Sequence, residues 1–147
     1  MNRPELTLLE KLQHEYALTD TGIAVTDITW TELDWSQTEM GARRPYVIVK
    51  RAGATRDQPV ELMFDFTFIV QVVWWYEHVN EVSDRRDDVW KIVEALKKIV
   101  GNQANLPDAN WHSMRVERDA NVSVLNVLPD VITENLTVIA KINWSDS

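Results

Sequence analysis

The sequence contains no cysteine, which excludes disulfide bonds, thiol catalysis and thiolate metal sites. Glycine is scarce: there are four, each at the boundary of a predicted element, so there is no glycine-rich loop of the kind that cradles phosphates. The histidines His14, His78 and His112 are far apart, and none has the spacing of a metal-binding pair. We expect His14 and His78 to face solvent or a partner. No group of residues combines a nucleophile, a base and an orienting side chain, so the sequence predicts a protein that is not an enzyme and uses no cofactor or metal.

Long apolar runs are also missing. No stretch approaches the roughly 20 apolar residues of a membrane helix, and the N-terminus lacks the apolar region of a signal peptide. We therefore expect the chain to stay in the compartment where it is made. Its 147 residues, of which 45% are hydrophobic and 26% charged, are typical of a globular protein, and we predict a single domain over residues 1–147.

Basic residues are in deficit, and the net charge is −8. This balance argues against a general nucleic-acid-binding protein, which would normally be basic. Five basic residues nevertheless gather in one short region, namely Arg43, Arg44, Lys50, Arg51 and Arg56. Two interpretations stay open: these residues keep a hairpin soluble, or they form a patch that docks on an acidic partner surface.

The strongest pattern in the sequence is a long stretch over residues 62–75 whose side chains alternate between two faces. One face of it is wholly apolar and carries Leu62, Phe64, Phe66, Phe68, Val70, Val72 and Trp74. The other face is mixed and ends in Trp75. Such alternation predicts a strand with its first face on the core and its second face only partly covered. Because Trp74 and Trp75 point to opposite faces, they cannot share an environment, and Trp75 is a candidate for contact with a partner.

An amphipathic helix is predicted directly after this strand, over residues 83–100. Its apolar stripe comprises Val82, Val89, Ile92, Val93, Leu96, Ile99 and Val100, and we expect it to pack on the phenylalanine-rich face of the strand. We expect Asn80 or Ser83 to supply the N-cap oxygen and Gly101 to take the left-handed position after the helix.

Charged residues near the start of this helix allow more than one interpretation. Asp84 and Asp88 lie four residues apart on one helix face, so a cation site is conceivable, but we favour a solvated first turn whose negative charge matches the helix dipole. Arg85 and Arg86 fall near the apolar stripe. Either their stems cover apolar surface while their heads reach water, or this end of the helix overhangs the sheet and meets another subunit.

The remaining pattern completes an α+β fold. A second helix is predicted over residues 4–18, with Leu6, Leu9, Leu12 and Tyr16 as its stripe, and β segments over residues 23–30, 46–50, 111–117, 122–128 and 135–144. The polar segments 36–44 and 52–59 are predicted loops. Short connections between neighbouring strands predict a mainly antiparallel sheet with two helices packed on one face.

This order of elements resembles the tail-terminator, or tail-completion, proteins of tailed bacteriophages and related proviruses. The resemblance rests on the first helix, the strand PYVIVK at 45–50, the long strand FDFTFIVQVVWW at 64–75, the helix at 84–100, the strand at 111–117 and a terminal strand. It covers nearly the whole chain but depends on patterning rather than on a motif.

The resemblance implies a virion protein of the phage tail with no catalytic residues, assembled in the host cytoplasm without a membrane. It implies a homo-oligomer, commonly a hexameric ring, that caps the tail tube, terminates its growth and takes part in head–tail joining by binding the head-side connector. DNA would pass through without specific binding, with which the acidic charge balance is compatible. The residues that we expect at partner interfaces are Arg43, Arg44, Arg51, Arg56, Arg85, Arg86 and Trp75.

Two other classes of function stay open. One is a different head–tail connector or minor tail protein on a similar frame, which would be recognised by the assembly intermediate that accumulates without it. The other is a small-ligand-binding domain or an unrecognised enzyme, which a closed polar pocket with converging ionisable groups would favour.

Overall fold

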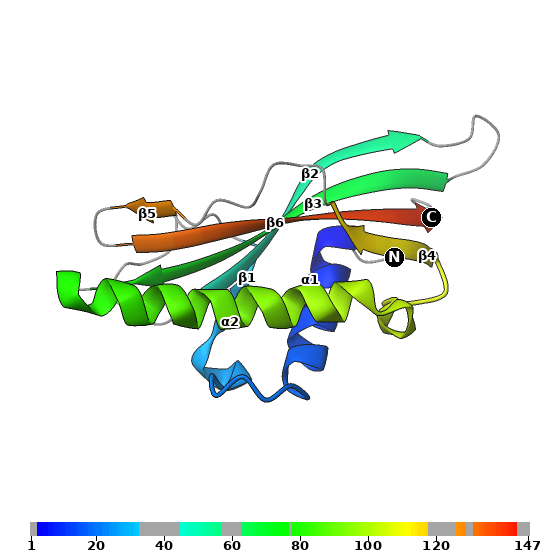
Figure 1. The fold of residues 1–147 in the computed structure, drawn as a ribbon. Coiled ribbons are helices and arrows are strands. Elements are labelled where there is room, and N and C mark those ends of the chain that lie inside the picture. The colour runs from blue at the N-terminus through cyan, green and yellow to red at the C-terminus, as the bar shows by residue number, and fades with distance from the viewer. Residues whose placement is uncertain are drawn as a thin grey trace.

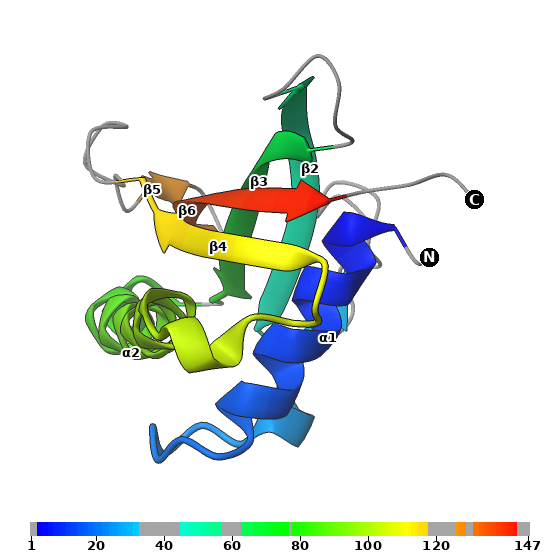
Figure 2. The same cartoon turned by 90° about the vertical axis from the view of Figure 1, so that its right-hand side faces the viewer.

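The computed structural model describes residues 3–32, 45–56, 63–76, 78–117, 126–128 and 131–143. Within these ranges the strands form one sheet in the order β1-β2-β3-β6-β4, with β5 paired to β6 (Figure 1). Only β1 (Thr29–Thr31) and β2 (Tyr46–Arg56) pair in parallel; the other described pairs are antiparallel. Both long helices cover the same face of the sheet (Figure 2). The predicted α+β fold with two helices on one face is therefore confirmed.

The central strand is β3 (Met63–Trp75), as predicted. It pairs with β2 on one side and, along its whole length, with β6 (Val131–Asn143) on the other. Phe66 and Phe68 are fully buried in the main core beneath the helices, whereas the opposite face of β3 is half-buried from Met63 to Gln71. The alternation in the sequence thus identified the covered face. Leu62, predicted on that face, lies outside the described residues.

The helix α2 (Val82–Gly101) carries the predicted apolar stripe. The members that are fully buried or nearly so are Val89, Ile92, Val93, Leu96, Ile99 and Val100, while Val82 is partly buried. In Figure 1 its first turn extends past the adjacent ends of β3 and β6. The overhanging helix end considered from the sequence is therefore present, although nothing yet shows what it meets.

Both predictions for the ends of α2 were wrong. The chain enters α2 through the 3-10 turn η3 (Val79–Glu81), and the N-cap residue Glu81 already has helical dihedral angles, so neither Asn80 nor Ser83 caps the helix. At the other end, Gly101 is the last helical residue and has no positive φ, and Asn102 leaves the helix in an extended conformation. The preceding turn and the extended exit replace the two caps that the sequence suggested.

The helix α1 (Pro4–Tyr16) starts with proline in its first turn, as predicted, and ends slightly early. Its buried residues are Leu8, Leu9, Leu12 and Tyr16, so Leu8 belongs to the stripe and Leu6 lies at its margin. The helix stops where the Thr19 hydroxyl donates a hydrogen bond of 2.7 Å to the Tyr16 carbonyl. The chain then turns through Gly22, whose φ of +80° is a conformation that favours glycine.

Two strand predictions need correction in the first half of the chain. Residues 23–30 form mainly bends and the 3-10 turn η1 (Val25–Asp27), because the short β1 finds a partner only in the first three residues of β2. β2 itself runs to Arg56 instead of ending at Lys50. A register shift between Arg51 and Gly53 lets the strand continue through the predicted loop while still pairing with β3. The predicted loop 36–44 lies outside the described residues.

In the second half, β4 (Trp111–Val116) agrees with the prediction. β6 begins at Val131 rather than at residue 135, because its first residues pair with β5 (Asn126–Leu128) and with the end of β3. Residues 118–125 and Trp144, which the predictions included, lie outside the described residues.

A second apolar cluster lies on the helix-free face of the sheet, and consists of Tyr46, Ile48, Val73, Trp75 and Val131. The rings of Tyr46 and Trp75 pack edge to face, with centroids 5.1 Å apart. Trp74 is packed instead against the main core. The two tryptophans therefore occupy different environments, as the alternation predicted.

Candidate functional site

The residues predicted at partner interfaces do not form one patch. Arg43 and Arg44 lie outside the described residues, and Arg56 is the last residue of β2. Arg51 lies beside α1, whereas Arg85 lies at the start of α2 and contacts the other end of β3. The basic patch of residues 43–56 is therefore not assembled by the described part of the chain.

Arg51 has a structural role that the sequence did not reveal. Its Nε and one terminal nitrogen donate hydrogen bonds of 3.0 and 2.9 Å to the Oε2 atom of Glu5 on α1. Its guanidinium also lies 5.1 Å from the ring centroid of Phe66. Arg51 thus links α1 to β2 and covers an aromatic ring of the core, so the charge is engaged within the subunit.

Arg85 and Arg86 behave differently from each other. Arg85 donates a 2.9 Å hydrogen bond to Asp88 and places its guanidinium 4.8 Å from the Trp74 ring centroid, so its stem and head cover apolar surface. Arg86 is exposed. Asp88 is paired with Arg85, and in the described ranges no group of three or more acidic or histidine side chains is arranged to hold a metal ion.

Trp75, the aromatic candidate, is buried in the second cluster and offers no surface to a partner. A different tryptophan is exposed. Trp90 on α2 is 54% exposed, and Leu18, just after α1, is 74% exposed. His14, His78 and His112 are exposed, as expected for the first two.

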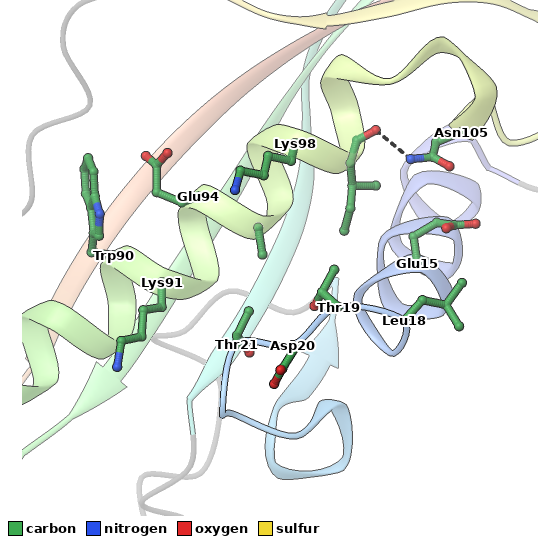
Figure 3. A pocket seen from close by; sticks show the side chains of 12 residues that line it. Glu15, Leu18, Thr19, Asp20, Thr21, Trp90, Lys91, Glu94, Lys98 and Asn105 are labelled. Atoms are coloured by element: carbon green, nitrogen blue, oxygen red, sulfur yellow. Dashed lines mark hydrogen bonds between the residues drawn. The ribbon is translucent and has the colours of Figure 1, made fainter.

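Leu18 and Trp90 line an open groove of about 580 Å³ between the C-terminal end of α1 and the outer side of α2 (Figure 3). Residues 18–21 form one wall, and Trp90, Lys91, Glu94 and Lys98 form the other. Ala95 and Ile99, both mostly buried, add apolar surface to the α2 side. Asn105 fixes one end by donating a 3.0 Å hydrogen bond to the Ile99 carbonyl. We call this feature the helix groove.

The charges around the helix groove divide into paired and unpaired groups. Glu15 lies 3.0 Å from the Lys11 ammonium, and Glu94 lies 3.3 Å from that of Lys97. The hydrogen bond from Lys11 holds the pKa of Glu15 below its ordinary value of 4.5, with a smaller opposing effect of partial burial. By contrast, Lys91, Lys98 and Asp20 form no ion pair with any residue that the structure describes.

The polar groups at the α1 side of the helix groove are engaged in local hydrogen bonds. The Thr19 hydroxyl donates to the Tyr16 carbonyl, and the Thr21 hydroxyl lies 2.7 Å from the Tyr16 hydroxyl. Burial raises the pKa of Tyr16, so this phenol stays protonated. These polar groups hold the turn after α1 and do not converge on a point in the groove. The groove thus combines exposed apolar side chains with charged walls.

Glu134 is a buried carboxylate that the sequence predictions missed, because they began the terminal strand at residue 135, directly after it. It is 2% exposed, lies opposite Val72 in the sheet, and shares the helix-covered face of β6 with Ile132 and Leu136. It does not line the groove. A buried carboxylate costs free energy unless it is paired. Glu134 does interact with another residue, although its Oε2 atom accepts no hydrogen bond within the described part of the chain.

Comparison of the chain with protein-family models and with curated protein sequences gives no match. Among the helices that the structure describes, none is both long and apolar enough to cross a membrane. The surface geometry and the order of elements therefore carry any functional assignment.

Proposed function

We propose that this protein is a non-catalytic virion protein of a tailed virus, in which identical subunits form a ring on the tail tube. The ring terminates tube growth and joins the head-side connector, while DNA passes through without specific contacts. The predicted series of one helix, a strand, a long strand, an amphipathic helix and further strands occurs in the structure in one sheet with one helical face. This order supports the resemblance to tail-terminator proteins.

The observation that carries the proposal is that the sheet extends beyond the part that the helices and β1 cover. β2 has 11 residues, yet β1 pairs only with Tyr46 to Ile48, and no other described strand pairs with this edge of β2. Residues 51–55 are exposed along it, and β2 and β3 rise together away from the helices (Figure 2). An exposed strand edge is a surface on which another chain can pair, which supports the proposed assembly of copies.

Deletion of the gene from the virus, followed by electron microscopy of the lysate, tests this function. We expect tails of uncontrolled length beside filled, unattached heads, and restoration of normal tails when the gene is supplied in trans. Tails of normal length that lack heads would instead indicate a connector without a terminator role. Normal infectious particles from the deletion would contradict the proposal.

A further inference from the structure

We infer that the helix groove of one subunit receives the N-terminal tip of α2 from a second copy of this chain. The tip comprises residues 79–87, which form η3 and the first turns of α2. The inference deepens the proposed ring and rests on it, because it names the contact through which copies join head to tail.

Apolar exposure singles out these two surfaces. The large hydrophobic side chains exposed in the described ranges are Leu18, Val79 and Trp90. Leu18 and Trp90 line the helix groove, and Val79, which is 85% exposed, lies on the tip. Exposed aromatic residues such as Trp90 are enriched near the centre of interfaces, while charged residues gather at the rim. Val79 is thus an apolar anchor for a groove that already presents two apolar side chains.

The unpaired charges on the two surfaces are complementary. The groove presents Lys91, Lys98 and Asp20, and the tip presents Asp84, Asp87 and Arg86. None of these six side chains forms an ion pair with another described residue. Two cations and one anion therefore face two anions and one cation. Such matching favours association between copies over random contact.

The tip cannot enter the groove of its own subunit. Val79 and Trp90 are 11 positions apart on one continuous helical segment, which corresponds to about 16 Å along the axis. The rigid helix keeps them apart, so the contact must form between copies. Because tip and groove are different surfaces, the contact is head to tail, and repetition closes a ring when the rotation permits.

Two charge-reversal variants test the inference on the purified full chain. The groove variant is Lys91→Glu/Lys98→Glu, and the tip variant is Asp84→Lys/Asp87→Lys. We expect the wild-type chain to assemble and each variant alone to sediment as a monomer. A 1:1 mixture should assemble again, because the acidic groove of one variant can bind the basic tip of the other, while the wild-type tip of the first binds the wild-type groove of the second. Arg115→Glu on the helix-free face and Glu10→Lys on α1 are matched controls that should assemble like the wild type.

Val79→Ser provides a second test that leaves the charges of the tip unchanged. We expect it to raise the dissociation constant about tenfold, because serine cannot replace the apolar surface that a buried valine contributes, while the fold of the single chain is unchanged. A monomeric wild-type chain at every concentration, variants that assemble normally, or a mixture that stays monomeric would each overturn the inference. If the variants still form a ring, the proposed contact is wrong, but the tail-terminator role is not contradicted. Assembly through this contact combined with normal tails in the gene deletion would refute that role instead.

Discussion

At the scale of single residues, Phe68 is the side chain on which the core depends most clearly. It is fully buried, and its ring stacks between Phe66 and Trp111, with centroid distances of 5.9 and 5.8 Å. Removing the ring leaves a cavity among rigid neighbours. Phe68→Ala should therefore lower the free energy of unfolding by about 3–5 kcal/mol, measured by urea denaturation. Ile69→Ala, on the half-buried face, is the control and should cost much less; equal costs would contradict the assignment of the core face.

Arg51 carries a prediction that differs from the one made by sequence reasoning. The sequence placed Arg51 at a partner interface, but Arg51→Glu would place a second carboxylate beside Glu5 and uncover Phe66. We expect the free energy of unfolding to fall by about 1–2 kcal/mol. The swapped pair Arg51→Glu/Glu5→Arg should recover part of this loss in a double-mutant cycle. Unchanged stability in Arg51→Glu would mean that the charge serves only an external contact.

The carboxyl of Glu15 reports on the wall of the helix groove. Its pKa lies below 4.5 chiefly because Lys11 donates a hydrogen bond to it. Since the pKa is lowered by folding, the pair stabilises the protein above about pH 4.5, and this contribution is lost as the pH falls through the lowered pKa. Lys11→Met should raise the pKa of Glu15, measured by NMR titration. The variant should be less stable than the wild type at neutral pH, and this difference in the free energy of unfolding should become smaller at acid pH.

His14 supplies the control for this titration. Its Nδ1 lies 3.4 Å from the same Glu15 oxygen, but it contributes less to the shift than Lys11. His14→Gln should therefore raise the pKa of Glu15 by less than Lys11→Met does. The reverse order would show that the wall of the groove is organised by the imidazole.

At the scale of elements, two glycines differ in whether the backbone conformation requires glycine. Gly101 ends α2 without a positive φ, and a Cβ there would meet no atom within 4 Å. Gly101→Ala should therefore stabilise the protein by about 0.4–1 kcal/mol, through the unfolded chain. Gly22 has equal space but a φ of +80°, and Gly22→Ala should destabilise by about 1–2 kcal/mol. Thermal melts of the two variants that shift in the same direction would contradict these backbone assignments.

Periodicity predicted the elements that have a strong hydrophobic pattern. It failed where pairing with a neighbouring strand determines whether a segment is a strand. The alternation around Phe66 and the stripe of α2 gave the core correctly, because burial on one face leaves a repeating signal. The extension of β2 through Gly53 was missed, since glycine and small residues favour a loop locally and only pairing with β3 makes them a strand. The β segment predicted over residues 23–30 failed for the opposite reason: its apolar residues find few partners in the sheet.

The helix groove was beyond the reach of sequence reasoning because its walls come from opposite halves of the helical layer. Leu18 and Trp90 meet only after α1 and α2 have packed together. One signal was available: Trp90 falls outside the apolar stripe of α2, which a core tryptophan would not do. The predicted basic patch misled because charge clustering in sequence does not reveal that Arg51 is engaged by Glu5.

At the scale of the whole molecule, the proposed assembly rests on two surface features. The helical layer carries a groove and a complementary tip, and the sheet leaves the far half of β2 open among the described strands. Both features expose side chains, namely Leu18 and Trp90 in the groove and residues 51–55 along β2. Both are explained if the working form of the protein is a closed set of copies, as capping a tube requires.

The measurement that tests this account most directly is the solution mass of the purified full-length chain, combined with negative-stain images of the same sample. The account predicts one concentration-stable oligomer whose particles are closed rings of uniform diameter with a central opening. Monomers at every concentration, or open filaments without rings, would contradict it.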